Sequence, residues 1–515
     1  MRGWSALAAI SAATLLTGLT AHSATLVYTN DVLGELEPCG CRHNPTGGLP
    51  RKGVLLDQSK DQQLLQLDAG DLLFETDVIP PALAPQRELQ AERLAKAHVE
   101  LGQDAVVPGE KDFALGLKIF DKIRKQTGLR FIAANLKLAK GGSFLESSAI
   151  FKRKRADGKG TLTIGVFGLV GSDLRYPSEL KVTTPLAAAR EQVQALKAQK
   201  VDRIIALTHQ GYEADVELAK SIPAIDVIVG GHTQTFLQQP VQQGNTTILQ
   251  SSFRNQYVGL ATLDEKITAE NHHLPALDES YEPSKNPASA RGKKMEARVA
   301  EWKVAVAKLN EREAIQLKRV EQASSESPHS YQTFAQCAGC HLKQFEFWRK
   351  TQHTHALEVL IAAGQHKNKD CLQCHTVGLG QPGGFKTVGD LFRLKNGLGS
   401  PSSEDLGVFL KAMREADSPK SEIKLVRTGP SLPLHQALAQ IDHAYSPVQC
   451  ENCHGAAGEH PFSTSPYKKT VANETCLKCH TAERAPSWYK DGKPNLELIS
   501  QKRVLVTCPA GEMSP

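Results

Sequence analysis

Short apolar runs alternate with longer amphipathic segments through the first half of the chain. Apolar and β-branched residues dominate at 25–29, 64–68, 130–135, 162–167, 203–207 and 224–229. Runs of this length are typical of buried strands. Residues 87–101, by contrast, have the period of a helix. The alternation predicts an α/β domain with a layered core over residues 24–282, and in such sheets the chemistry lies beyond the strand ends.

A different pattern begins at residue 283. Residues 283–291 form a polar connector that contains proline, and a long charged helix is expected at 293–321. Its apolar residues recur at helical spacing on one stripe, at Val299, Trp302, Val306 and Leu309. A single stripe on a charged helix indicates packing against a neighbour. We therefore assign residues 283–324 to a linker and charged helix.

Four copies of Cys-x-x-Cys-His follow in residues 325–515. They are Cys337, Cys340 and His341; Cys371, Cys374 and His375; Cys450, Cys453 and His454; and Cys476, Cys479 and His480. In this motif the two thiols attach a haem covalently and the histidine becomes an iron ligand, so one short segment carries all three groups. Two zinc ribbons are the alternative, but zinc ribbons do not need a histidine after each pair.

The repetition predicts a tetrahaem c-type cytochrome domain over residues 325–515. We expect it to be mainly helical and rich in loops, because the four cofactors replace much of an apolar core. A helix is expected at 404–416, inside a stretch at 387–447 that has no motif of its own.

The N-terminus has the features of an export signal. Arg2 precedes an apolar stretch at 6–19, and small residues at Ala21 and Ser23 predict cleavage after Ser23. Residues 1–23 are therefore expected to be a signal peptide, and nothing later approaches a membrane-spanning length. Covalent haem attachment outside the inner membrane agrees with export, so we expect a periplasmic location, with release to the outside as the alternative.

Net charge and cysteine content limit the classes of partner and cofactor that the protein is expected to bind. The formal charge is +6, from 61 basic and 55 acidic residues, which is too small an excess to indicate nucleic-acid binding. Eight of the eleven cysteines are haem anchors, which leaves Cys39, Cys41 and Cys508. Cys39 and Cys41 follow the first strand and admit three interpretations: a disulfide, soft metal ligands or a redox pair. Cys508 has no evident partner.

Residues of metal-ligand type stand at the ends of several predicted strands. They occur in five segments, 29–31, 68–71, 108–112, 207–211 and 230–234, and include Asp31, Asp71, Glu110, His209, His232 and Gln234. Carboxylates and imidazoles that converge from separate strand ends suit a metal-dependent hydrolase. Each segment alone is weak evidence, whereas five in order are much stronger.

The five segments resemble the calcineurin-like metallophosphoesterases, specifically the catalytic domain of the periplasmic 5'-nucleotidase family. The resemblance covers about residues 24–280 and implies a four-layer α/β/β/α sandwich. The ligands that it implies are Asp31 and Gln234 for a first metal ion, Asp71 between two ions, and His209 and His232 for a second ion. Glu110 stands where the family has an asparagine, and its carboxylate can still act as a ligand there.

Two departures from that family pattern lower the expected activity. Leu33 stands where the family has a histidine ligand, and Lys111 stands where it has the histidine that assists the leaving group. We therefore expect one divalent metal ion (Mn, Zn or Fe), a small-molecule or phosphate ligand, and phosphoester hydrolysis that is weak or lost. The second domain of those nucleotidases is absent, and the cytochrome takes its place.

Residues from about 331 to 488 resemble the tetrahaem cytochrome c-554 family. The matching stretches are 340–348, 371–378 with 383–385, and 450–455 with 459–460. The resemblance implies that His355 and His460 are distal haem ligands, each on a haem attached elsewhere, with His443 as a third choice. Other candidates are His329, His353, His366 and His435. Some relatives carry a further histidine near the C-terminus, but this chain has none after His480, so one haem is expected to lack a strong sixth ligand.

These observations favour an exported tetrahaem cytochrome that transfers electrons to redox partner proteins and carries a degenerate metallophosphoesterase-like domain. One alternative is a working metal-dependent phosphoesterase with a haem module. Another is a reductase that acts on a small nitrogen or sulfur oxyanion at an open haem.

Overall fold

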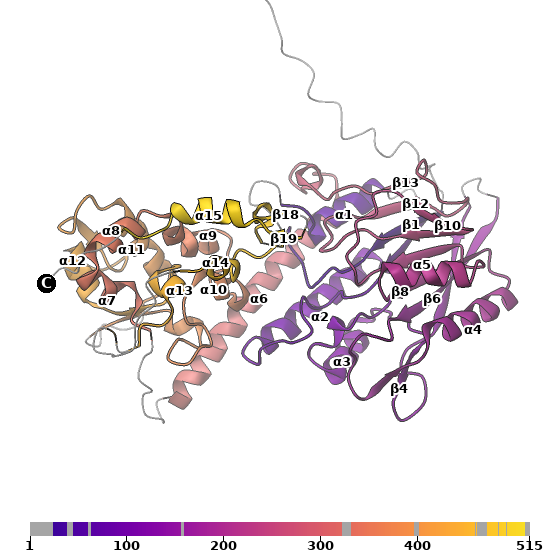
Figure 1. Ribbon diagram of the computed structural model, residues 1–515, viewed down its shortest axis with the longest axis horizontal. Helices are drawn as coiled ribbons and strands as arrows, with labels where there is room; N and C mark the ends of the chain where they lie inside the picture. Colours follow the sequence, from indigo (N-terminus) through magenta and orange to yellow (C-terminus); the bar gives the residue numbers. More distant parts are fainter. Residues whose placement is uncertain are drawn as a thin grey trace, which may run out of the picture. The chain divides into compact units, whose positions relative to one another are not determined.

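The protein is described by a computed structural model, drawn in Figure 1. It describes residues 24–38, 45–59, 63–155, 159–321, 331–395, 401–458, 460, 471–482, 484–490 and 492–509, with backbone alone at 317–321. The predicted signal peptide, Cys39 and Cys41 lie outside the described residues. The chain divides into two compact units, Met1–Ala300 and Glu301–Pro515.

The first unit contains two main sheets. One has the order β13 (His272–His273), β12 (Gly259–Thr262), β1 (Ala24–Thr29), β2 (Gln63–Asp68) and β3 (Ala105–Val106). The other has the order β10 (Val241–Gln243), β11 (Thr246–Leu249), β9 (Val227–Gly230), β8 (Arg203–His209), β6 (Thr161–Val170) and β5 (Ser148–Lys154). A separate pair joins β4 (Leu136–Leu138) to β7 (Leu180–Val182).

The central strands are parallel, and this places the site. β1 pairs with β2 from Ala24↔Gln63 to Thr29↔Asp68, and β2 pairs with β3 in the same direction. In the second sheet β6, β8 and β9 are parallel as well. Every residue of β1 is buried, as expected of a strand that is covered on both faces. The carboxyl ends of neighbouring strands therefore meet at one edge of each sheet.

Helices cover the outer faces of the sheets. They are α1 (Leu49–Gln58), α2 (Ala84–Leu101), α3 (Leu117–Thr127), α4 (Pro185–Ala198) and α5 (Tyr212–Ser221), with short 3-10 helices η1 (Lys111–Phe113) and η2 (Glu279–Tyr281). Residues of α4 and α5 share a core with the second sheet, as Val193 and Leu218 do with Ile228. Figure 1 shows α2 and α3 on the opposite side of the strands from α4. The predicted α/β sandwich is confirmed.

One predicted strand does not form. The pattern predicts a strand at 130–135, but the structure has only the isolated bridges Val106↔Phe131 and Ile132↔Glu146 there. The reason is that this segment runs between sheets. The Ile132 N–H donates to Val106 O (2.9 Å) beside β3, and the Ala134 N–H donates to Gly168 O (2.8 Å) in β6. Its apolar residues are buried because they cross the core.

The long charged helix is α6 (Ala290–Glu321), and the division between the two units falls within it. Its predicted stripe is largely buried: Val299, Trp302 and Val306 are buried and Leu309 is half-buried. The helix therefore buries the face that its apolar spacing predicts.

The second unit is built from short helices and two-stranded sheets. Its helices are α7 (Thr333–Cys340), α8 (Leu342–Trp348), α9 (Ala356–Ala362), α10 (Lys369–His375), α11 (Ser403–Glu415), α12 (Leu434–Ala439), α13 (Cys450–His454), α14 (Asn473–Leu477) and α15 (Leu496–Val504), with 3-10 turns η3 (Gln352–His355), η4 (Val388–Asp390) and η5 (Pro486–Trp488). Its strand pairs are β14 (Phe392–Leu394) with β17 (Ile441–Ala444), β15 (Glu422–Lys424) with β16 (Ser431–Pro433), and β18 (Tyr489–Lys490) with β19 (Lys493–Pro494). The predicted helical, loop-rich character is confirmed.

The second unit also has a substantial apolar core. Phe334 of α7 and Trp348 of α8 pack with Phe392, Phe409 and Tyr445. The last three residues belong to the stretch at 387–447, which carries no motif. That stretch therefore supplies a packed core, whereas the sequence led us to expect cofactors in place of one.

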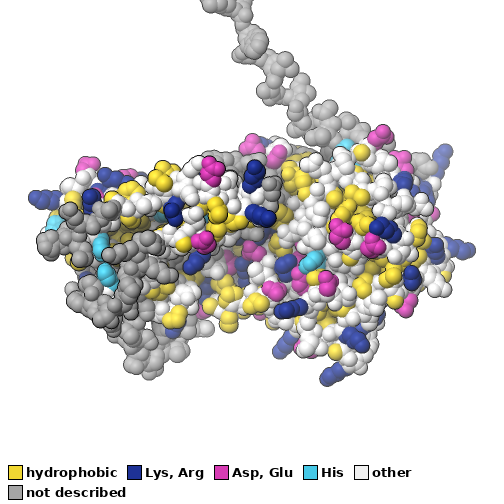
Figure 2. Space-filling view, in the orientation of Figure 1, with side chains coloured by type: hydrophobic (Ala, Val, Ile, Leu, Met, Phe, Trp, Pro, Cys, Tyr) yellow, Lys and Arg dark blue, Asp and Glu magenta, His cyan; other side chains and the backbone are white. Residues whose placement is uncertain are grey.

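Charges of both signs are interspersed over the face drawn in Figure 2, in keeping with the small net charge. Among the described residues, no helix combines the length and the apolar character needed to cross a membrane.

Candidate metal centre and haem-binding region

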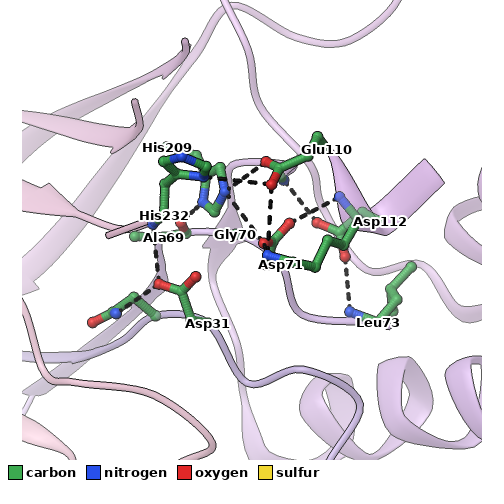
Figure 3. A network of polar contacts seen from close by, with 12 residues as sticks. Asp31, Ala69, Gly70, Asp71, Leu73, Glu110, Asp112, His209 and His232 are labelled. Carbon is green, nitrogen blue, oxygen red and sulfur yellow. Dashed lines mark hydrogen bonds and ion pairs between the residues drawn. The ribbon is translucent and has the colours of Figure 1, made fainter. Parts of the chain in front are cut away.

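Five of the predicted ligands meet in the first unit. Asp31 follows β1, Asp71 follows β2, Glu110 follows β3, His209 ends β8 and His232 follows β9. Figure 3 shows Glu110 beside the two imidazoles, with Asp71 and Asp31 close by. Asp31, Asp71 and His209 are fully buried, while Glu110 is largely buried. The strand ends of both sheets therefore converge on one cluster, as the sequence predicts.

His209 is oriented by the backbone. Its Nδ1 donates a hydrogen bond to Ala69 O (2.7 Å), which leaves Nε2 to face the carboxylates. Nε2 lies 3.1 Å from Glu110 Oε2 and 3.5 Å from Asp71 Oδ2. Burial alone lowers the pKa of His209, but Asp71 and Glu110 raise it well above its usual range. A nitrogen aimed at two carboxylates in this way needs a proton or a metal ion between them.

Two glycines allow this close approach. Gly70 has a left-handed backbone (φ 90°), and a Cβ there would lie 2.7 Å from His209 Nδ1. A Cβ on Gly109 would lie 2.1 Å from Asp71 Oδ1. Any side chain at either position would displace a candidate ligand, so the turns after β2 and β3 require glycine.

Asp31 is held with one oxygen to spare. Its Oδ2 accepts hydrogen bonds from Asn30 Nδ2 (2.8 Å) and from the His232 N–H (3.0 Å). Its Oδ1 is buried and has no hydrogen-bond partner in the part of the chain that the structure describes. Burial raises the pKa of Asp31 to about 6, against the opposing effect of His209. A buried carboxylate oxygen without a donor is expected to face a cation.

The donor set fits a divalent ion. Glu110, His209 and His232 each offer a ligand atom, and these atoms lie within 4.8 Å of one another. Asp31, Asp71 and His209 form a second such group. Carboxylate oxygen and imidazole nitrogen suit Mn²⁺, Zn²⁺ and Fe²⁺. Asp112 braces the loop instead, because its two oxygens accept the N–H groups of Leu73 (2.7 Å) and Gly109 (2.8 Å).

Two further positions that the family pattern gives as metal ligands are occupied by Leu33 and Gln234, and neither side chain is hydrogen-bonded to the cluster. Leu33 is buried and apolar, at the place where the family pattern has a histidine. Gln234 has a left-handed backbone (φ 53°) and is half-buried, but its side chain makes no hydrogen bond to a described residue. Among the described residues, the candidate ligands on the side of the centre around Asp31 are therefore Asp31, Asp71 and His209.

The contacts of Lys111 differ from those that the family pattern leads us to expect at its position. The resemblance places it near a leaving group, whereas in the structure its Nζ contacts Asp71 Oδ2 and lies 3.5 Å from Glu110 Oε1. Sequence reasoning missed this contact, because spacing along the chain does not fix the direction of a long flexible side chain.

In the second unit each haem motif lies on a helical turn. The motifs fall at the end of α7, in α10, in α13 and at the end of α14. The N–H of His341 donates to Cys337 O (2.9 Å), and that of His480 donates to Cys476 O (3.0 Å). Residues three and four apart share one face of a helix, so both thiols and the imidazole point to the same side. This geometry fits covalent haem attachment.

The motifs lie together in pairs. The first and third are joined by Glu451, which accepts the N–H groups of Gln332 (3.1 Å) and Thr333 (2.8 Å) at the start of α7. The second and fourth are joined by a hydrogen bond between the thiols of Cys374 and Cys479, which raises the pKa of Cys479. Cys508 is exposed and forms no disulfide with another described cysteine.

Two pairs of histidine rings have the spacing of ligands on one iron. The ring centroids of His341 and His460 are 5.9 Å apart, and those of His353 and His480 are 6.4 Å apart. Metal–imidazole bonds are about 2 Å long and each centroid lies about 1 Å behind its nitrogen, so two axial imidazoles have centroids about 6 Å apart. If a haem is attached at the first motif, His460 would therefore be able to act as its second histidine ligand.

His353, two residues from the predicted ligand His355, is the histidine that lies at this spacing from His480. The resemblance favours His355, whose side chain is 42% exposed and lies 3.4 Å from Glu358. His443 is buried, with Nδ1 near Asp442 (3.1 Å) and Nε2 near Asp390 O (3.1 Å). His353 and His355 are two residues apart, and the 3-10 turn η3 sends them in different directions.

The other candidates have different surroundings. His366 lies 3.0 Å from Glu404, and His435 lies 3.0 Å from Pro419 O. His329 lies outside the described residues. The assignments of His355, His443 and His460 as distal ligands stay predictions.

Comparisons with known proteins give one group of matches for the cytochrome region and another for the N-terminal region. Residues 336–397 match the family described as cytochrome c554 and c-prime. The 5'-nucleotidase of Bos taurus is 28% identical over 227 residues, which are 41% of this chain and 38% of that protein. The snake venom 5'-nucleotidase of Crotalus adamanteus is 27% identical over 229 residues, 41% of this chain and 37% of that protein. The chain therefore spans about two fifths of the length of these relatives.

Among solved structures, the 5'-nucleotidase precursor of Thermus thermophilus is similar to 55% of this chain and 59% of its own, with 22% identity and a TM-score of 0.46. The sequence comparisons show that the chain joins an N-terminal region similar to 5'-nucleotidases to a C-terminal region in which residues 336–397 match the cytochrome c554 and c-prime family.

Proposed function

We propose that the protein is an exported tetrahaem c-type cytochrome that transfers electrons between redox partner proteins in the periplasm. The observation that carries the proposal is the set of four Cys-x-x-Cys-His motifs on helical turns, grouped in pairs. Haems attached at neighbouring motifs would pass electrons from one to the next. The 5'-nucleotidase-like unit, with one divalent ion and a weak or lost hydrolytic activity, would bind a partner or a small ligand.

We expect the purified protein to carry four covalent haems. Intact mass spectrometry after acid extraction should find four haem additions on a chain that begins near Ala24. Two or fewer additions, or stoichiometric zinc on the cysteine-rich region, would contradict the proposal. The reduced absorption spectrum provides an independent haem count on the same sample.

We expect His353 to be the distal ligand of the haem attached at Cys476 and Cys479. Substitution His353→Ala should convert one of the low-spin haems to high-spin, because His480 then keeps only solvent on the opposite side of the iron. The matched comparison is His355→Ala, two residues away, which should leave the haem attached at Cys476 and Cys479 low-spin. Electron paramagnetic resonance of the oxidised variants distinguishes them, and the reverse result would restore His355 as the ligand.

The second candidate function is metal-dependent phosphoester hydrolysis. It is supported by the convergence of Asp31, Asp71, Glu110, His209 and His232 on one cluster. A phosphomonoesterase assay with controlled metal content separates the two functions, since electron transfer needs no hydrolytic turnover.

A further inference from the structure

Lys111 lies inside the metal centre, where its backbone amide and its side-chain ammonium both contact Asp71. Its backbone N–H donates to Asp71 Oδ1 (3.0 Å), and its Nζ contacts Asp71 Oδ2. The residue begins the 3-10 helix η1, so its amide and its ammonium reach the two oxygens of one carboxylate. The side chain is 19% exposed. Little water therefore competes for this ammonium, and the ion pair is correspondingly strong.

The total charge of the carboxylates around Lys111 determines how many cations make the cluster electrically neutral. Asp71 and Glu110 lie against its ammonium, and Asp31 contributes to the same field. One ammonium and one divalent ion balance three carboxylates. Two divalent ions together with the ammonium would leave an excess of two positive charges in a buried cluster, which a bound anion would have to offset.

The ligands left for a second ion are also few. Leu33 is 5% exposed, contributes no ligand, and donates its backbone N–H to Asp71 O (2.8 Å). Asp71 Oδ2, which a bridging ion would need, is already in contact with Lys111. An ion near Asp31 would therefore have Asp31 Oδ1 to itself, and would share His209 with the ion held by Glu110 and His232, and Asp71 with Lys111.

We propose that the ammonium of Lys111 takes the place of one of two metal ions, so that the N-terminal unit holds a single divalent cation through Glu110, His209 and His232. This inference rests on the metal centre of the proposed function and deepens it. A consequence is that the loaded centre is close to neutral. It therefore lacks the excess positive charge that attracts a phosphate dianion to a two-metal site.

Metal stoichiometry tests the inference on the full-length haem-loaded protein. The protein is stripped with chelator and dialysed against Mn²⁺, and bound manganese is counted apart from haem iron by mass spectrometry. We expect one ion in the wild type, and its electron paramagnetic resonance spectrum should be that of isolated Mn²⁺. The Leu33→His variant should also bind one ion, because the ammonium remains. The double variant Leu33→His/Lys111→Met should bind two, with the signal of a spin-coupled pair.

Controls separate the possible outcomes. Lys118→Met removes an exposed lysine from α3 and should bind one ion, as should Lys111→Arg, which keeps the charge. Circular dichroism reports whether each variant is folded. Two ions in the wild type, or one ion in a folded double variant, would overturn the inference alone. No manganese in any folded variant would overturn it and also remove the metal centre from the proposed function, while the haem count would be unaffected.

Discussion

The Mn²⁺-loaded protein is expected to hydrolyse phosphomonoesters about two to four orders of magnitude more slowly than the bovine 5'-nucleotidase assayed beside it. A positioned acid or base contributes roughly that factor to a rate. Lys111 replaces the histidine expected to assist the leaving group, and its ammonium is engaged with Asp71. Leu33 removes a metal ligand as well. Initial rates with AMP and with an aryl phosphate provide the comparison.

The control for this result is Asp71→Ala, which removes the carboxylate at the centre of the cluster. Any residual rate that belongs to this site should disappear in the variant, while contaminating activity should persist. Efficient metal-dependent turnover that Asp71→Ala abolishes would contradict the prediction. It would show that Glu110 and Lys111 support catalysis in place of the residues that they replace.

At least one haem is expected to be high-spin, and the structure favours the haem attached at Cys371 and Cys374. The ring of His375 donates from Nδ1 to Ala356 O (2.6 Å), which leaves Nε2 for the iron. Among the described residues, no second histidine ring pairs with it at the spacing found for His341 and His480. The oxidised protein should show a high-spin ferric resonance, and carbon monoxide should change the reduced spectrum.

This prediction decides between transfer and catalysis. An open haem beside others can bind a small molecule and receive electrons, as a reductase of a small oxyanion requires. The His353→Ala variant is a useful standard, because it should increase the carbon monoxide response by one further haem. Four low-spin haems without carbon monoxide binding would remove the reductase alternative and leave electron transfer alone.

Much of the metal centre was predictable because its residues follow strands. The segments after β1, β2, β3, β8 and β9 are local in sequence, and parallel sheets place such ends together. Lys111 and Gln234 were less predictable. A lysine has four rotatable bonds, so its direction depends on which carboxylate lies nearest in the folded unit. The structure, rather than the spacing, connects Lys111 to Asp71.

In the second unit, too, the sequence predicted some features and missed others. Short motifs locate Cys337 and His341 on one helical turn, since only residues three and four apart are involved. The core contributed by the stretch at 387–447 was not predicted, because its apolar residues are scattered over short elements without a clear period. The bridging of sheets by residues 130–135 was missed for a related reason: an apolar run reports burial and not the partner of its backbone.

The sequence by itself indicated the features that depend on neighbouring residues: the alternation of strands and helices, the four Cys-x-x-Cys-His segments, and the candidate ligands that follow the strands. Only the tertiary structure decided which distant side chains meet. It brings His353 rather than His355 to His480, 6.4 Å between centroids, and it turns Lys111 into the carboxylate cluster. The physical reason is that contacts between residues far apart in the chain arise from the packing of whole elements. A shift of two residues along a 3-10 turn rotates a side chain by about 120° around the helix axis, so the two side chains have different neighbours.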